Sequence, residues 1–170
     1  VPLDLDSNPY DKLTHAGIYG MDVLMGTLEK LYDIEIDYYF RVNFTGFTDI
    51  IDALGGIDVY SAYTFETKQV KGYSFQEGIN HMDGEAALAF CVERNSFPDG
   101  DRQRGRNHMA VIEAVIQKAQ SPSILTGYLD ILTSIENYID TSIPYDLMAD
   151  LVRWQLTESP QWEIETYSVN

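Results

Sequence analysis

The sequence predicts an α/β fold in which helices flank a central mixed β-sheet in layers. Helical and strand patterns alternate along the chain, and 45% of the residues are hydrophobic, which suits a packed core. A chain of 170 residues has the length of one domain, so we assign residues 1–170 to a single domain. The composition excludes a disordered protein.

The first 60 residues supply the first half of these elements. Residues 1–20 contain several prolines and glycines and are expected to be irregular. The expected elements that follow are a helix over 21–32, a strand over 34–44, a short helix from Thr45 or Thr48 to 54, and a strand over 57–60. Either threonine would cap the short helix, and the pair Gly55-Gly56 would end it.

The remaining residues predict a hairpin region and then mostly helices. The expected elements are a hairpin or meander over 61–80, helices over 84–93, 105–120, 124–139 and 145–156, and a closing strand over 162–169. Asp83 is a suitable N-cap for the first of these helices. The helix over 105–120 is expected to bury an apolar face made of Met109, Val111, Ile112, Val115 and Ile116.

Four of the six arginines, Arg94, Arg102, Arg104 and Arg106, lie within residues 94–108, although the chain has a formal net charge of −16. Guanidinium groups offer planar forks of N–H donors that match phosphate oxygens. A helix starting near residue 105 would place Arg104 and Arg106 beside free N–H groups and a partial positive charge. This pattern favours a phosphate site. The alternative is a solvated cluster in which the arginines pair with acidic neighbours.

Other candidate sites give weaker signals. Asp99 and Asp101 lie among the arginines and carry the hard oxygen ligands that Mg²⁺ prefers. The three histidines are not spaced as zinc ligands, and the single cysteine, Cys91, has the apolar neighbours of a buried, unreactive thiol. The acidic charge argues against nucleic acid as a partner. The apolar helix faces suit either a core or a groove for a lipid tail, and both readings stay open.

Five segments follow one another in a recognisable order. They are residues 10–16 (YDKLTHA), 37–44 (DYYFRVNF), 52–59 (DALGGIDV), 81–88 (HMDGEAAL) and 93–107, which begins Glu93-Arg94 and ends Arg104-Gly105-Arg106-Asn107. Together they resemble the LytR-CpsA-Psr family, and most closely its streptococcal capsule-type members. The resemblance covers nearly the whole chain.

The resemblance implies a layered α/β fold and an extracellular phosphotransferase of Gram-positive type, tethered by an N-terminal membrane helix. Such enzymes move a glycopolymer, for example capsule or teichoic acid, from a polyprenyl-pyrophosphate carrier to peptidoglycan. The resemblance also implies a bound Mg²⁺ and an apolar tunnel that holds the lipid.

The resemblance also implies roles for individual residues. By position, Arg94 and Arg104 match arginines that bind the pyrophosphate, and Asp101 matches an acidic residue linked to the metal or phosphate site. Arg94, Asp101 and Arg104 are therefore the expected catalytic residues, with Asp101 as the candidate base for the acceptor hydroxyl. Three further basic residues are expected to contact the pyrophosphate: Arg106, Lys12 and Arg41.

The chain also departs from the family pattern. Val92 stands where members commonly have an arginine, and Asn107 stands where many have another. The family's early strand, with metal-binding aspartates, would lie before Val1. Without these groups the chain by itself is expected to have weak or no activity. Two alternatives follow: a non-catalytic domain that binds a polyprenyl phosphate or regulates envelope assembly, and an acidic α/β domain whose arginines pair internally.

Overall fold

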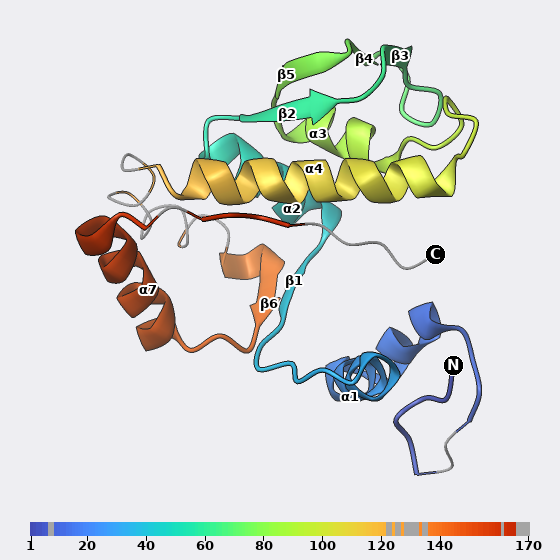
Figure 1. Ribbon diagram of the computed structural model, residues 1–170, viewed down its shortest axis with the longest axis vertical. Helices are drawn as coiled ribbons and strands as arrows, with labels where there is room; N and C mark the ends of the chain where they lie inside the picture. Colours follow the sequence, from blue (N-terminus) through green and yellow to red (C-terminus); the bar gives the residue numbers. More distant parts are fainter. Residues whose placement is uncertain are drawn as a thin grey trace. The chain divides into compact units, whose positions relative to one another are not determined.

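The computed structural model describes residues 1–6, 9–121, 124, 127, 133, 136–160 and 162–165. The chain divides into two compact units, Val1–Tyr39 and Phe40–Asn170 (Figure 1). The assignment of all 170 residues to a single domain stays a prediction.

The first unit is built on helix α1 (Met21–Tyr32), which has the predicted bounds. A 3-10 helix, η1 (Leu13–Tyr19), precedes it, so the region predicted to be irregular is partly helical. Leu3 is fully buried, and the backbone N–H of Asp4 donates to the hydroxyl of Thr27 on α1 at 2.9 Å. This hydrogen bond attaches the start of the chain to α1.

The second unit begins with strand β1 (Phe40–Val42), which pairs antiparallel with β6 (Ile139–Thr141). The strand predicted over 34–44 was too long, because β6 offers only three residues for pairing. Asn43 then ends the strand and starts a helix, so the aromatic residues on either side belong to different elements.

Helix α2 (Phe44–Ala53) is capped by Asn43, whose Oδ1 accepts the backbone N–H of Gly46 at 2.7 Å. The prediction of Thr45 or Thr48 as the cap was wrong, because both lie inside the helix. Its end is as predicted: Gly55 and Gly56 follow with φ angles of 73° and 81°, which the absence of a side chain permits.

The strands pair as three antiparallel two-stranded sheets in the described part of the chain. The longest joins β2 (Ile57–Ser61) to β5 (Gly78–Met82), with Ile57 opposite Met82. Between them, β3 (Phe65–Glu66) pairs with β4 (Ser74–Phe75), which gives the predicted hairpin region. The α/β class is confirmed, although these strands form separate ladders instead of one mixed sheet.

Two helices pack with the β2–β5 sheet around the core. Asp83 caps α3 (Gly84–Val92) as predicted, since its Oδ1 accepts the backbone N–H of Ala86 at 2.9 Å. Figure 1 shows α4 (Asp101–Ala119) running alongside α3 and β2. The core between these elements contains a group of buried apolar side chains: Ile51, Ile57, Val59, Phe65, Phe75, Met82, Phe90 and Val111.

Helix α4 starts at Asp101, earlier than the predicted start at residue 105. Gly100 turns the chain with a φ of 38°, and the backbone N–H of Arg104 already donates to its carbonyl at 3.0 Å. Gly105 is therefore an interior helical residue and does not mark the start of the helix. The cost of an interior glycine, about 1 kcal/mol, is small beside the burial that this helix achieves.

The C-terminal part of the second unit contains η2 (Glu136–Tyr138), β6 and α7 (Tyr145–Glu158). Helix α7 is predicted correctly and runs two residues further than expected. The predicted helix over 124–139 lies mostly outside the described residues, and its last residues belong to η2 and β6 instead. Of the predicted strand over 162–169, the described residues 162–165 are not in a strand, and the rest lies outside.

The helices that the structure describes are too short or too polar for a membrane span.

Candidate anion-binding site

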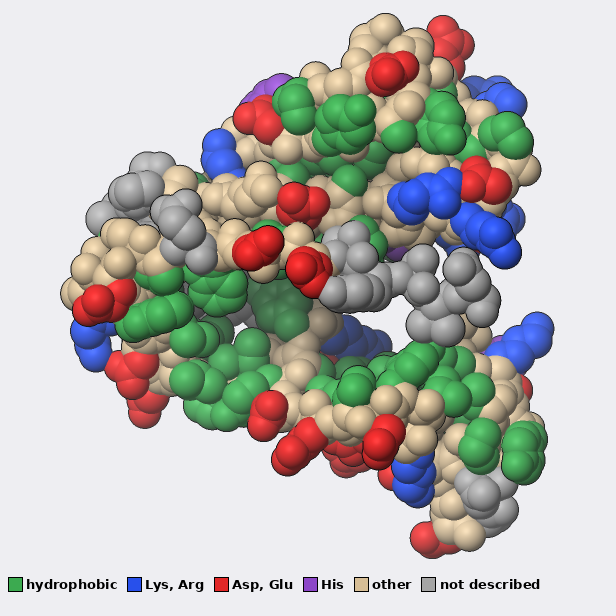
Figure 2. Space-filling model, in the orientation of Figure 1, with side chains coloured by type: hydrophobic (Ala, Val, Ile, Leu, Met, Phe, Trp, Pro, Cys, Tyr) green, Lys and Arg blue, Asp and Glu red, His purple; other side chains and the backbone are tan. Residues whose placement is uncertain are grey.

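The arginine loop, residues 94–100, connects the end of α3 to the start of α4. Arg94 follows α3 closely, and Arg104 lies one turn into α4. Figure 2 shows Lys and Arg side chains gathered over this end of α4. Two secondary-structure ends therefore bring cationic side chains into one region of an otherwise acidic protein.

Arg94 and Arg104 converge on one carboxylate. Oδ1 of Asp101 lies 3.1 Å from Nη2 of Arg104 and 3.8 Å from Nη1 of Arg94. The Arg104 pair joins residues three apart on a helix, a spacing at which side chains are neighbours. All three side chains keep access to solvent, at 49% for Arg94, 36% for Arg104 and 68% for Asp101. We call these three residues the anion site, because two guanidinium forks here point at the position of a negatively charged oxygen.

Arg106 has different partners from the anion site. Its guanidinium forms a short ion pair with Asp99, and its Nε–H donates to Oε1 of Gln103 at 2.7 Å. The hydrogen bond from Arg106 holds the pKa of Asp99 below its ordinary value, and the charges of Arg106 and Arg102 add to the effect. Arg106 is therefore already engaged within the protein.

The other two predicted basic residues, Arg41 and Lys12, belong to other elements of the chain. Arg41 is on β1, and its Nη1 faces Oδ2 of Asp140 on β6 at 4.0 Å. Lys12 is the N-cap residue of η1 in the first unit, where its backbone N–H donates to Oδ1 of Asp11. The structure thus brings Arg94, Asp101 and Arg104 together, without Arg41.

Magnesium was predicted near Asp101. Among the described residues there is no group of three or more histidine, cysteine, aspartate or glutamate side chains that could hold a metal ion. Asp99 and Asp101 instead face arginines. The carboxylates present in this part of the chain do not by themselves fit a magnesium site, since Mg²⁺ demands six oxygen ligands in octahedral geometry.

Asn107 is a buried structural residue. Its Nδ2 donates to the carbonyl of Phe90 at 3.2 Å, and its Oδ1 accepts from Nε2 of Gln103 at 2.9 Å. The side chain is only 3% exposed. Asn107, which stands where many family members have an arginine, therefore ties α4 to α3 and is buried. Val92, the other departure, is the half-buried last residue of α3.

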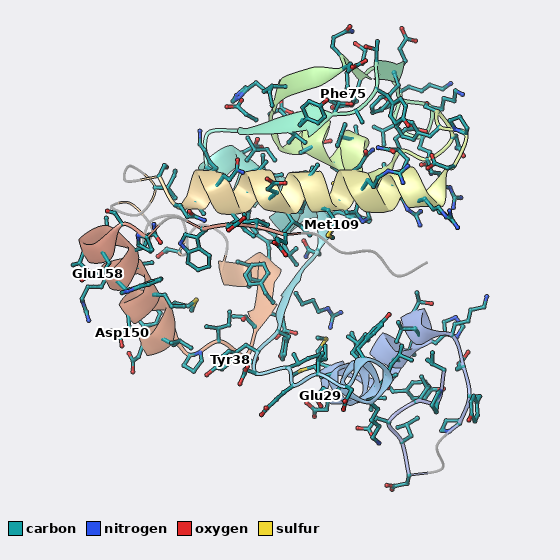
Figure 3. All side chains as sticks on the ribbon, viewed as in Figure 1. Glu29, Tyr38, Phe75, Met109, Asp150 and Glu158 are labelled. Atoms are coloured by element: carbon teal, nitrogen blue, oxygen red, sulfur yellow. The ribbon has the colours of Figure 1, made fainter. Side chains whose placement is uncertain are left out.

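The buried face of α4 also differs from the prediction. It consists of Gln103, Asn107, Val111 and Ala114, at helical spacing. Met109 and Ile112, which were predicted to be buried, are 38% and 49% exposed, and Figure 3 shows Met109 on the side of α4 away from β2 and β5. The predicted face was wrong because two amides, Gln103 and Asn107, occupy core positions, where they bond to each other and to the carbonyl of Phe90.

Two residues that were not predicted, Glu93 and Lys68, contact the arginine loop. Glu93 is fully buried, and Lys68 donates from Nζ to the carbonyl of Asn95 at 2.9 Å. A signal for Glu93 was present: an acidic residue at a helix C-terminus is unfavourable with the helix dipole and needs strong donors. Nothing in the sequence indicated Lys68, because it approaches the loop from a distant segment.

Cys91 is a buried free thiol. Burial raises the pKa of the Cys91 thiol to about 12, which agrees with the predicted unreactive thiol.

A hollow of about 200 Å³ lies between the β2–β5 sheet and α4. Its lining includes the carboxylates of Asp58 and Glu113 as well as Tyr60 and Ile79, so its walls are of mixed polarity.

Comparison with known proteins agrees with this architecture. A match to the LytR_cpsA_psr family spans residues 4–170. The chain is 40% identical over 142 residues to the polyisoprenyl-teichoic acid–peptidoglycan teichoic acid transferase TagU of Bacillus cereus, which covers 83% of this chain and 46% of that protein. The chain thus spans about half the length of this curated relative.

Solved structures share the fold. A protein of Enterococcus faecalis described as a transcriptional regulator superposes with a TM-score of 0.77 and 31% identity, covering 89% of this chain and 56% of that one. TagT bound to LIIa-WTA has a TM-score of 0.69 and 28% identity, covering 92% and 60% of the two chains. From the family match over almost its full length, the chain belongs to the LytR-CpsA-Psr family.

Proposed function

We propose that this chain is part of an enzyme that transfers a cell-wall glycopolymer from a polyprenyl-pyrophosphate carrier to peptidoglycan. The observation that carries the proposal is the convergence of Arg94 and Arg104 on one carboxylate oxygen, Oδ1 of Asp101, at the start of α4. A pyrophosphate needs planar, permanently charged donors of this kind. The name of the Bacillus cereus relative, a teichoic acid transferase, and the name of TagT bound to LIIa-WTA support the same chemistry.

The helix that carries Arg104 also suits the lipid part of such a carrier. Gly105, Met109 and Ile112 follow one another at spacings of four and three, and all three are exposed. Residues at this spacing lie on one face of a helix. An amphiphile whose phosphates meet the arginines would find this exposed apolar face on the same helix.

The proposed reaction uses the anion site as follows. The acceptor hydroxyl of peptidoglycan attacks the phosphorus that carries the glycopolymer, and the bond from that phosphorus to the polyprenyl phosphate breaks. Asp101 takes the hydroxyl proton, and the leaving phosphate keeps the electron pair of the broken bond. Arg94 and Arg104 stabilise the negative charge that moves onto the leaving group.

Other parts of the predicted function stay proposals. The glycopolymer is teichoic acid, capsule polysaccharide or a related wall polymer, and the enzyme acts at the outer face of a Gram-positive membrane to which it is anchored. Magnesium is expected from the resemblance. Its ligands would have to include groups outside the described residues, so no step of the proposed reaction depends on it.

The test is a pair of substitutions in the full-length protein. We expect Arg94→Ala and Arg104→Ala each to abolish transfer of a lipid-linked glycopolymer to peptidoglycan, while circular dichroism shows an intact fold. Arg153→Ala is the matched control, because Arg153 forms an exposed pair with Asp150 on α7. Normal transfer in both site variants would refute the proposal. Tight lipid binding by a wild-type protein that does not transfer would instead support the binding or regulatory alternative.

A further inference from the structure

Glu93 is a buried carboxylate that the proposed reaction does not use. It follows α3 directly and has no exposed surface. A buried carboxylate is costly unless hydrogen bonds replace its water. Within the described part of the chain, four backbone N–H groups donate to Glu93.

These four donors belong to two separate segments of the chain. Oε2 accepts from the N–H groups of Lys68 and Gln69 at 2.6 and 3.0 Å. Oε1 accepts from those of Asn95 and Ser96 at 2.6 and 3.0 Å. One carboxylate therefore joins the segment after β3 to the start of the arginine loop.

Three other contacts attach the same loop to β3 and the residues that follow it. Nζ of Lys68 donates to the carbonyl of Asn95 at 2.9 Å, and the hydroxyl of Ser96 donates to the carbonyl of Glu66 at 2.7 Å. The ring of Phe97 packs edge-on against Phe65, with centroids 4.6 Å apart. The carboxylate of Glu93 is the buried centre of this set of contacts.

Arg94 lies in the chain between Glu93 and the two residues whose N–H groups donate to Glu93. The residue before it supplies the anchored carboxylate, and the two residues after it supply N–H donors to that carboxylate. Its backbone is thus held on both sides, while its side chain extends to Asp101. Arg104 is held separately on α4, which Asn107 ties to the carbonyl of Phe90 near the end of α3.

We propose that Glu93 is a positioning residue, which fixes the backbone of Arg94 so that its guanidinium and that of Arg104 meet on the same phosphate. This inference rests on the proposed function, because it assigns Glu93 a role in binding the pyrophosphate. Glu93 itself does not touch the substrate. Its effect passes through Arg94.

The four N–H donors around Glu93 require an ionised carboxylate. An ionised carboxylate is an acceptor at both oxygens, so each oxygen can take two N–H groups. In a glutamine, the NH₂ group would face two N–H donors, and those donors would lose their acceptor. Burial by itself would raise the pKa of Glu93, but the four N–H donors outweigh it, so the pKa is lowered and the group is ionised in the folded protein.

The test compares Glu93→Gln with Asp83→Ala in the full-length protein. Asp83 caps the opposite end of α3, so its loss destabilises the same helix without touching the arginine loop. The measurement is the affinity for inorganic pyrophosphate by calorimetry, at a temperature where circular dichroism shows each variant folded. We expect Glu93→Gln to weaken binding by about tenfold or more, and Asp83→Ala to leave it unchanged.

Arg94→Ala is then introduced into the wild type and into Glu93→Gln. A purely structural role of Glu93 would leave the effect of Arg94→Ala on pyrophosphate affinity the same in both. In the wild type, Arg94→Ala should weaken pyrophosphate binding, whereas in Glu93→Gln it should add little, because the misplaced arginine no longer contributes. Glu93→Asp keeps both acceptor oxygens on a shorter side chain and should bind with intermediate affinity. It also serves in place of Glu93→Gln if that variant does not fold.

The possible outcomes separate the two proposals. Equal pyrophosphate affinity in the wild type and the Glu93 variants would overturn the positioning role and leave the proposed function intact. Additive effects of the Arg94 and Glu93 substitutions would overturn it as well. A wild-type protein that binds no pyrophosphate and transfers no glycopolymer would overturn both.

Discussion

Asp101 lies one helical turn before Arg104 on α4, and its Oδ1 is 3.1 Å from the Arg104 guanidinium. The same oxygen faces Arg94 at 3.8 Å, so Asp101 has two possible roles: it orients the arginines, and it accepts a proton from the acceptor hydroxyl. Substitution by asparagine separates these roles, because an amide oxygen accepts hydrogen bonds from arginine but does not take up a proton.

We therefore expect Asp101→Asn in the full-length protein to lower kcat for glycopolymer transfer by about a hundredfold or more, the range for loss of a general base. The affinity for inorganic pyrophosphate should not fall, because the substitution removes a negative charge beside the two arginines. Asp146→Asn is the matched control, because Asp146 also occupies the first turn of an exposed helix, α7. An unchanged kcat in Asp101→Asn would show that another group accepts the proton.

Glu93 gives the protein a pH-dependent component of stability. Its pKa in the folded protein is lowered from the ordinary value of 4.5, so its contribution to the free energy of unfolding is fully present above that value. The contribution is lost as the pH falls through the lowered pKa of the folded state. We expect Glu93→Gln to cost about 3 kcal/mol near neutral pH, and progressively less below about pH 4.

Urea unfolding of both proteins across this pH range measures the difference. Asp99→Asn is the control: the pKa of Asp99 is also lowered, by its hydrogen bond from Arg106, but the group is exposed to solvent. Solvent screening should make its effect on stability small at every pH. A stability difference for Glu93→Gln that stays constant from neutral to acid pH would contradict the linkage.

The sequence predicted best the elements whose boundaries depend on local chemistry. The bounds of α1, the Asp83 cap of α3 and the glycine pair after α2 were all predicted correctly, because caps and helical spacing act within a few residues. Asn43 was missed as a cap because it sits in an aromatic-rich segment typical of a strand. Only the pairing of β1 with β6 shows how short that strand is.

The candidate site was predictable in composition but not in geometry. The clustering of arginines indicated an anion site, yet the predicted helix start after Arg104 hid its three-residue spacing from Asp101. The anchoring of Glu93 by Lys68 and Gln69 joins residues about 25 apart, as no local pattern can indicate. Long-range backbone contacts of this kind follow from the tertiary fold alone.

Cys91 should be inert in the folded protein. Burial raises its pKa to about 12, so the thiol stays protonated at pH 8, and the thiolate is the reactive form. We expect negligible reaction with Ellman's reagent in the native state and complete reaction in denaturant. Rapid labelling of the native protein would mean that α3 opens locally around Cys91.

Two glycines should respond to alanine in opposite directions. A Cβ on Gly84 would lie 2.3 Å from the carbonyl oxygen and 2.6 Å from the Cα of Thr48 on α2. Both are backbone atoms, so α2 and α3 would have to separate. A Cβ on Gly105 would meet nothing within 4 Å, and its helical backbone suits alanine better than glycine.

We expect Gly84→Ala to lower the free energy of unfolding by about 3 kcal/mol, as overpacking against a rigid neighbour does. Gly105→Ala should raise it by roughly 0.5–1 kcal/mol, the difference between the two residues inside a helix. Urea denaturation of the two variants and the wild type gives both values. Destabilisation by Gly105→Ala similar to that by Gly84→Ala would mean that the surface of α4 at Gly105 is covered in the folded protein, against the exposed apolar face proposed to meet the lipid.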